Sequence, residues 1–205
     1  TLPYVNADPH IGFALEIVQA DVLARAWRLQ GDEVFFTTGT DEHGQKIYDA
    51  AKKAGQEVQD YVDQYADAVR KLRGSLNVST DAFIRTTSAT HIKAAQEMWR
   101  RCEAKGDIYK KTYTGLYCVG CELFKTDKEL VDEKCPIHQN LVLQEISEEN
   151  YFFKFSKYQD DLLTYLNRSD AICPEWRRIE AVNFVQGGLE DFSISREKSR
   201  LSWGV

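Results

Sequence analysis

Four residues of metal-binding types lie close together near the middle of the chain. They form two doublets, Cys118-x2-Cys121 and Cys135-x2-His138, with thirteen residues between them. Each doublet places two ligands on one side of a tight turn, which is the arrangement of a tetrahedral zinc knuckle. Unrelated buried thiols would not explain two doublets, and disulfides are rare in a cytoplasmic chain. We predict a structural Zn2+ ion, because four protein ligands leave no open position for a catalytic one.

A second group of residues has the chemistry of a phosphate site. The run Pro9-His10-Ile11-Gly12 follows a short extended segment and precedes a helical pattern. A helix N-terminus presents unpaired N–H groups and a partial positive charge to an anion. Gly12 lets a ligand approach the backbone, and His10 can donate to a phosphate oxygen. A helix cap or a core side chain is the other interpretation of His10, so its context decides.

A loop further along the chain is similar to a phosphate-binding loop of the Gly-x4-Gly-Lys-Ser/Thr kind. It runs over residues 39–46, but Gln45 stands where that motif requires lysine. Two carboxylates within the loop, Asp41 and Glu42, would also repel phosphate. We therefore reject this interpretation of the loop.

Alternating strands and helices are predicted to position these residues. Strand-like segments occupy residues 1–4, 33–38 and 81–87, and the second of them reads as short and buried. Helical spacing of apolar residues follows Gly12 as far as Gly31, and recurs over 45–54, 58–72 and 90–104. Repeated strand-then-helix order is typical of a parallel sheet, so we predict an α/β fold of the Rossmann type.

A smaller unit is predicted to interrupt this sheet domain. Tyr, Thr and Gly become frequent at about residue 108, just before the two Cys/His doublets. A strand over 151–155, helices over 158–166 and 175–186, and an extended run over 192–196 follow. We predict the first half of the Rossmann-type domain over 1–106, a zinc-knuckle insertion over 107–190, and the return to the first domain over 191–205.

Composition and charge narrow the class of protein. With 26 Lys and Arg against 32 Asp and Glu, the net charge is −6, so no overall field favours nucleic acid or anionic membranes. No apolar run approaches the roughly 20 residues that cross a bilayer, and no secretory leader is visible. We expect a cytoplasmic protein with no membrane partner. Because the chain begins with Thr1 and has no terminating signal at Val205, we also expect a segment of a longer protein.

Taken in order, the motifs resemble those of methionyl-tRNA synthetases, which are class I aminoacyl-tRNA synthetases. They comprise residues 2–12, Gln19-Ala20-Asp21, residues 40–44, the two Cys/His doublets and Ile194-Ser195-Arg196. Ligases for valine, leucine or isoleucine share the His-x-Gly signature and an inserted domain. The Leu-Pro-Tyr opening and the Ile-Ser-Arg run fit the methionine enzymes better. The resemblance implies a Rossmann-type catalytic domain that is split by a connective-peptide insertion carrying the zinc knuckle.

The resemblance also implies a reaction. ATP would be bound with Mg2+, and the carboxylate of methionine would attack its α-phosphorus, so that pyrophosphate leaves. The resulting methionyl adenylate would then acylate the 3′ end of tRNA(Met). This chemistry depends on positioning and charge stabilisation. The family's Lys-Met-Ser-Lys-Ser loop is absent from this segment, so the segment alone is expected to be inactive. Two alternatives stay open: a sister class I ligase for another apolar amino acid, and a zinc-bearing module that binds tRNA or protein without catalysis.

The resemblance assigns the nucleotide to the start of the chain. His10 and Gly12 would hold the ATP phosphates and act in catalysis, with Asn6 and Glu16 near the nucleotide. The family signature carries a second histidine directly after the glycine, where this chain has Phe13. Phenylalanine cannot donate a hydrogen bond, so one contact to the nucleotide is expected to be missing or supplied by another group.

Four further residues are assigned to the amino acid. Asp41 would hold the substrate ammonium group, and Arg196 would pair either with Asp41 or with the substrate carboxylate. Leu2 and Tyr4 would form two walls of a methionine pocket, where apolar and aromatic surface suits a thioether.

Overall fold

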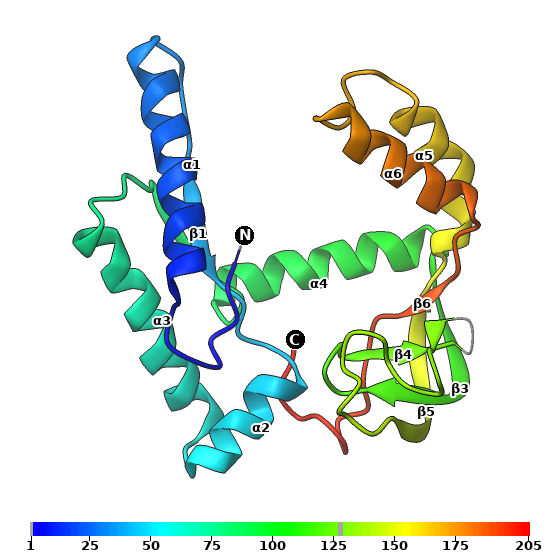
Figure 1. Ribbon diagram of the computed structural model, residues 1–205. Coiled ribbons are helices and arrows are strands. Elements are labelled where there is room, and N and C mark those ends of the chain that lie inside the picture. Colours follow the sequence, from blue (N-terminus) through cyan, green and yellow to red (C-terminus); the bar gives the residue numbers. More distant parts are fainter. Residues whose placement is uncertain (1, 127–128) are drawn as a thin grey trace. The chain divides into compact units, whose positions relative to one another are not determined.

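The computed structural model describes residues 2–126 and 129–205 (Figure 1) and divides into two compact units. Unit 1 comprises Thr1–Gln96, Leu116–Gln144 and Leu201–Val205, and unit 2 comprises Glu97–Gly115 and Glu145–Arg200. Thr1, the first residue of the predicted opening strand, lies outside the described residues. The domain boundaries predicted from the sequence stay a prediction.

Unit 1 contains a parallel sheet. Strands β1 (Thr37–Thr40) and β2 (Ala82–Arg85) pair in parallel. The opening segment pairs with the residue after β1, since Tyr4 and Asp41 form a parallel bridge in which the Asp41 N–H donates to the Pro3 carbonyl at 2.9 Å. Successive residues of an extended chain direct their backbone groups to opposite sides. The opening segment and β2 therefore flank β1, and the predicted α/β fold class with a parallel sheet is confirmed.

Four helices connect and follow these strands. They are α1 (Ile11–Leu29), α2 (Gln45–Ala54), α3 (Val58–Ser75) and α4 (Ala89–Ala104). The predicted bounds of α2 are the observed ones, and its C-cap Gly55 takes a left-handed conformation with φ of 69°. That conformation carries little steric cost for glycine, which explains why the helix ends there.

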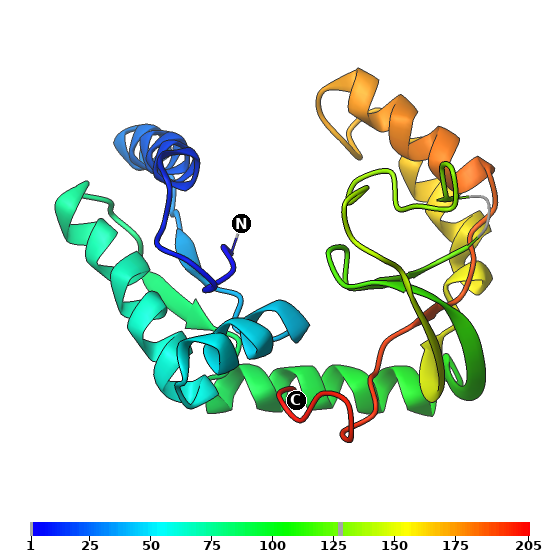
Figure 2. The ribbon, with the colours of Figure 1, turned by 60° about the horizontal axis from the view of Figure 1, so that its bottom comes forward.

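Helix α3 packs against both α1 and α2 (Figures 1 and 2). One end contributes Tyr61 and Val62 to a cluster with Val5 and Ile47. The other end contributes Val69 to a second cluster, with Phe13, Ile17 and Val78. Burying each large apolar side chain contributes roughly 1.5–3 kcal/mol, so these clusters fix α1 and α2 relative to the sheet.

The strand predicted over residues 33–38 was wrong in its extent and burial. The ladder begins only at Thr37, and Phe35 is 75% exposed. Before Thr37 the chain is held by Asp81, whose carboxylate accepts from the Phe36 N–H at 2.6 Å and whose own N–H donates to the Phe36 carbonyl at 2.7 Å. The apolar run favoured a buried strand, but only Phe36 of its two phenylalanines packs against a core cluster.

Unit 2 combines antiparallel strands with a helical pair. Strand β3 (Ile108–Cys118) ends in unit 1, where it pairs with β4 (Leu123–Lys125). Strand β5 (Gln144–Phe153) pairs with β6 (Phe192–Ser193). The order of strands in this sheet is β4-β3-β5-β6. A 3-10 turn, η2 (Phe155–Tyr158), leads into α5 (Gln159–Leu166) and then α6 (Glu175–Gln186). The two helices lie side by side around Leu166, Val185 and Leu189 (Figures 1 and 2). The predicted strand over 151–155 matches the end of β5 only as far as Phe153, because Phe155 already begins η2.

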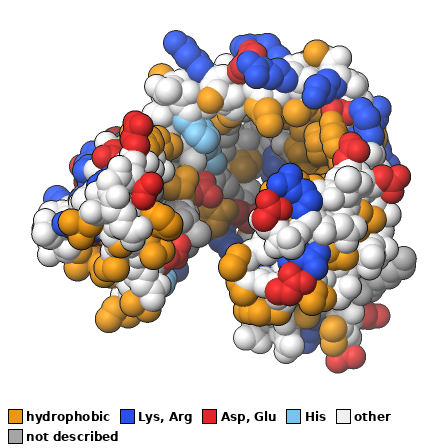
Figure 3. Space-filling view, turned by 90° about the horizontal axis from the view of Figure 1, so that it is seen from above, with side chains coloured by type: hydrophobic (Ala, Val, Ile, Leu, Met, Phe, Trp, Pro, Cys, Tyr) orange, Lys and Arg blue, Asp and Glu red, His pale blue; other side chains and the backbone are white. Residues whose placement is uncertain are grey.

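The surface of the molecule carries both apolar and charged side chains (Figure 3). Helix α1 buries Phe13 and Ile17, whereas Leu15, Leu23 and Trp27 are each more than half exposed. In the part of the chain that the structure describes, no helix has the length and apolar character needed to span a membrane.

Candidate active site and metal centre

The four predicted metal ligands come together in unit 1. The Nδ1 atom of His138 lies 3.7 Å from the Cys118 Sγ and 3.3 Å from the Cys121 Sγ, and the Sγ atoms of Cys121 and Cys135 are 3.5 Å apart. All four ligand atoms lie within 4.8 Å of one another. A tetrahedral zinc ion with ordinary Zn–S and Zn–N bonds would separate its ligands by about 3.6–3.8 Å. The ligand set therefore fits Zn2+.

The local backbone brings the four ligands together and favours a thiolate among them. Cys118 ends β3 and the turn to β4 carries Cys121, so the first doublet is fixed by the hairpin. A side chain at Gly120 would place its Cβ 2.5 Å from the His138 ring, so the close approach of the two doublets requires glycine there. Burial acts to raise the pKa of the Cys135 thiol, but hydrogen bonds from the backbone of His138 and Ile137 outweigh it and lower the pKa to about 6. Those N–H groups favour the thiolate that binds metal.

The predicted phosphate residues form the N-terminus of α1. His10 is the N-cap, and its Nδ1 atom accepts a hydrogen bond from the Gly12 N–H at 3.0 Å. Because Nδ1 is the acceptor, the proton of the neutral ring is on Nε2, which can donate outward. His10 and Gly12 are exposed, whereas Phe13 is only 6% exposed and packs in a core cluster. Capping and phosphate binding are therefore compatible in His10, and Phe13 serves the core.

Tyr4 and Asp41, which are predicted to bind the amino-acid substrate, are neighbours across the parallel bridge. The Tyr4 hydroxyl donates to the Glu122 Oε2 atom at 2.8 Å, and the Glu122 Oε1 atom accepts from the Lys46 N–H at 2.9 Å, in the first turn of α2. Burial, together with this carboxylate, raises the pKa of Tyr4 far above its ordinary value. Glu122 was not predicted as part of the site. It directly follows the metal ligand Cys121, so the knuckle contacts Tyr4, one of the two predicted walls of the methionine pocket.

Two titratable groups of the loop after β1 have shifted pKa values. Burial raises the pKa of Asp41, and although the backbone N–H and the ring of His43 oppose that shift, the net direction is upward. Burial likewise lowers the pKa of His43 against the raising effect of Asp41 and Glu42. Shifted pKa values are common at functional sites, and these two residues follow the carboxyl end of a parallel strand.

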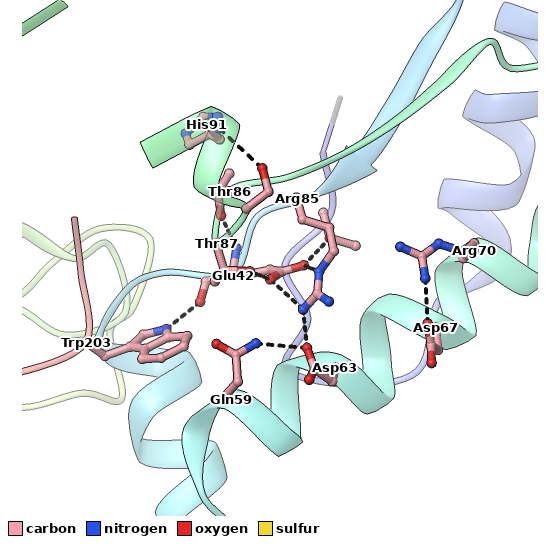
Figure 4. A network of polar contacts seen from close by, with 12 residues as sticks. Glu42, Gln59, Asp63, Asp67, Arg70, Arg85, Thr86, Thr87, His91 and Trp203 are labelled. Atoms are coloured by element: carbon pink, nitrogen blue, oxygen red, sulfur yellow. Dashed lines mark hydrogen bonds and ion pairs between the residues drawn. The ribbon is translucent and has the colours of Figure 1, made fainter. Parts of the chain in front are cut away.

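A polar network that was not predicted from the sequence holds the same loop (Figure 4). It joins Glu42 to Arg85 at the end of β2, and Arg85 to Asp63 of α3. Trp203 completes it from the far end of the chain, with its Nε1 donating to the Glu42 carbonyl at 2.6 Å. The sequence showed only that Arg85 ends an apolar strand, and this position alone does not predict which residue it contacts.

Comparison with known proteins matches the chain to one family along its length. The family model described as tRNA synthetases class I (M) matches residues 1–146 and 141–205. This chain belongs to the class I (M) tRNA synthetase family.

Relatives of this class I synthetase chain are similar to it along its whole length. It is 44% identical to the methionine–tRNA ligase of Thermotoga maritima, covering 98% of this chain and 32% of the relative. It is 47% identical to that of Thermosynechococcus vestitus, covering 99% of this chain and 38% of the relative. A structure of Mycobacterium tuberculosis methionyl-tRNA synthetase in complex with methionyl-adenylate superposes with a TM-score of 0.91 at 43% identity, covering 100% of this chain and 40% of that one. The chain thus spans about a third of the length of these curated relatives.

The remaining predicted site residues of this class I synthetase chain are divided between the two units. Asn6 is exposed after the opening segment, and its carbonyl accepts from the Tyr61 hydroxyl at 3.0 Å. Glu16 lies on the exposed side of α1, and Leu2 is 39% exposed. Arg196 belongs to unit 2, where its guanidinium donates to the Ser195 carbonyl at 2.7 Å. Its pairing with Asp41 stays a prediction.

Proposed function

We propose that the protein carrying this chain activates methionine with ATP, forms methionyl adenylate and transfers the methionyl group to the 3′ end of tRNA(Met). The observation that supports this most is the parallel bridge that makes Tyr4 and Asp41 neighbours at the carboxyl ends of adjacent strands, in the same opening segment that leads into the N-terminus of α1. Ligands of open α/β sheets bind at this edge. The similar Mycobacterium tuberculosis structure is a complex with methionyl-adenylate.

In this proposal each residue acts on substrate by charge or shape. His10 donates from Nε2 to an ATP phosphate at the positive N-terminus of α1, with Gly12 allowing close approach and Asn6 and Glu16 nearer the nucleoside. This stabilises the charge that develops as pyrophosphate leaves. Mg2+ enters with ATP as part of the substrate.

The amino acid is held by the other four residues. The Asp41 carboxylate pairs with the substrate ammonium group, and Arg196 with Asp41 or the substrate carboxylate. Leu2 and Tyr4 present apolar and aromatic surface to the thioether. Alignment of the substrate carboxylate with the α-phosphorus then depends on the fixed positions of these groups.

The metal centre is structural in this proposal. Cys118, Cys121, Cys135 and His138 would hold Zn2+ with four protein ligands, so the ion supplies a folded knuckle and no chemistry to the substrates. Thiolate ligands must stay reduced to bind metal, which supports a cytoplasmic location.

The proposed function is tested by amino-acid-dependent exchange of labelled pyrophosphate into ATP. The full-length protein is assayed separately with methionine, valine, leucine, isoleucine and cysteine. We expect exchange with methionine at a kcat/KM well above that of the others. Exchange with a different amino acid would retain the class I mechanism and overturn the methionine pocket. No exchange from folded, zinc-loaded protein would favour a module that binds tRNA or protein without catalysis.

Asp41 gives the proposed reaction an expected pH dependence. Its carboxylate must be ionised to pair with ammonium, and burial raises its pKa in the free protein. As the pH falls through that raised pKa, Asp41 becomes neutral and kcat/KM for methionine decreases, at a higher pH than an ordinary carboxyl would produce. The measurement is kcat/KM for methionine between about pH 5 and pH 8 in the exchange assay.

Two variants test whether Asp41 causes this pH dependence. Asp41→Asn is expected to remove the acid limb, because its side chain does not titrate, and Asp60→Asn, on an exposed position of α3, is expected to leave it unchanged. An unaltered acid limb in Asp41→Asn would show that another group titrates.

A further inference from the structure

Glu42 is a buried carboxylate in the loop that carries the predicted site residue Asp41. Its exposure is 0%, whereas Asp41 and His43 on either side are partly exposed. Neighbouring residues of an extended chain direct their side chains to opposite faces. The chain thus presents Asp41 and His43 on one face and directs Glu42 into the protein on the other.

Hydrogen bonds surround the Glu42 side chain (Figure 4). Arg85 donates twice, from Nε to Oε1 at 2.7 Å and from Nη2 to Oε2 at 2.9 Å. The Thr40 hydroxyl donates to Oε1 at 2.5 Å, and the Thr87 hydroxyl donates to Oε2. A buried charge that is paired and fully hydrogen-bonded is tolerated, whereas losing one partner is strongly unfavourable. These contacts leave the side chain one favourable position.

The backbone of Glu42 is held as well. Its N–H donates to the Thr86 hydroxyl oxygen at 2.8 Å, and its carbonyl accepts from the Trp203 indole at 2.6 Å. The Trp203 ring also lies 5.6 Å from the His43 ring, centroid to centroid. Glu42, the second residue after β1, is therefore fixed through both its side chain and its main chain.

Arg85 connects this loop to α3. Its Nη2 atom also donates to the Asp63 carboxylate at 2.5 Å, and Gln59 donates to the same carboxylate oxygen at 2.8 Å. Although burial opposes the shift, these hydrogen bonds lower the pKa of Asp63, and the two acids raise the pKa of Arg85. One planar guanidinium thus links the loop, β2 and α3, a geometry that a lysine ammonium cannot reproduce.

We propose that Glu42 is a positioning residue, which through its paired hydrogen bonds with Arg85 holds Asp41 where it meets the ammonium group of the amino-acid substrate. This role rests on the proposed function. Displacing a substrate-binding group by about 1 Å can cost up to about a hundredfold in rate, so loss of the pair acts on amino-acid use even though neither Glu42 nor Arg85 touches substrate.

The test compares Glu42→Gln and Arg85→Lys with the wild-type full-length protein. Gln removes the charge that both Arg85 nitrogens recognise, and Lys keeps the positive charge but loses the planar fork. The control is Glu97→Gln, which removes a carboxylate of α4 that is likewise paired with arginine, here with both Arg100 and Arg101, but is 47% exposed. Pyrophosphate exchange gives KM for methionine, KM for ATP and kcat, while hydrogen exchange by mass spectrometry follows the amides of residues 40–44.

We expect Glu42→Gln to raise KM for methionine by about tenfold or more, with a smaller rise in Arg85→Lys and less than about a threefold change in KM for ATP. Amide exchange over 40–44 should become faster in both variants and stay unchanged in Glu97→Gln. A merely structural role would lower kcat through loss of folded protein and leave both KM values unchanged.

Four results would count against the proposal in different ways. Unchanged amide exchange over 40–44, or faster exchange with an unchanged KM for methionine, would overturn the positioning role while the proposed function stands. A proportional loss of kcat with both KM values unchanged would do the same. Absence of methionine-dependent exchange in the wild type would overturn the proposed function, and with it the positioning role that rests on it.

Discussion

Substitution of Cys118 by serine is expected to remove the zinc ion and to unfold the knuckle. Cys118 is fully buried at the end of β3, and its thiolate is one of the four ligands that would hold the ion. Apparent binding free energies of structural zinc are roughly 10–16 kcal/mol in small zinc-binding peptides, and in such sites metal binding and folding are coupled. Serine presents a poor ligand for zinc, so most of that stabilisation of residues 118–138 is expected to be lost.

Metal analysis and thermal unfolding measure this effect. Wild-type protein should contain about one zinc ion per chain, and Cys118→Ser well under half of that, with a lower melting temperature. Chelator treatment of the wild type should lower its melting temperature in the same direction. Cys102→Ser, in the partly exposed cysteine of α4, is the matched control and should keep both zinc and stability. Well under one zinc ion per wild-type chain would contradict the predicted metal centre.

The metal ligands and α2 could be predicted because their signals are local. The two doublets bring their ligands together through short turns, so spacing alone determined the set. Helix α2 lies between Gly44 and Gly55, and its buried residues Ile47 and Ala51 are four positions apart on one face. In both cases the residues that define the feature are close in sequence and need no partner elsewhere.

The contacts that complete the candidate site could not be predicted in this way. Tyr4 meets Glu122 across 118 residues, and Glu42 meets Arg85 across 43. In the sequence, Glu42 and Glu122 each look like an ordinary loop carboxylate. Only the three-dimensional fold buries Glu42 against Arg85 and brings Glu122 to the Tyr4 hydroxyl. Phe13 illustrates the same limit, because its place in a signature drew attention to chemistry whereas the structure assigns it to the core.

Substitution of His10 by alanine is expected to lower the kcat of methionine activation by about a hundredfold to a thousandfold. That range is typical for losing one hydrogen-bond donor to charge that develops in a transition state. The ring is exposed, and with Nδ1 accepting from Gly12 its Nε2 proton is available to a phosphate. Phe13→Ala should act differently, because removing a buried aromatic ring costs about 3–5 kcal/mol of stability and removes no donor.

His10→Asn separates the capping role of His10 from its proposed phosphate role. The asparagine oxygen can accept from the Gly12 N–H as Nδ1 does, and Asn is among the preferred N-cap residues, so α1 and the melting temperature should be preserved. Its shorter side chain has no donor at the position of Nε2, so activation should fall nearly as far as in His10→Ala. The readouts are pyrophosphate exchange at saturating ATP and methionine, and thermal unfolding of each variant. Only a donor role of His10 makes the three variants differ. His10 would therefore be a helix cap alone if His10→Asn kept wild-type exchange. The same conclusion would follow if folded His10→Ala and Phe13→Ala lost equal activity.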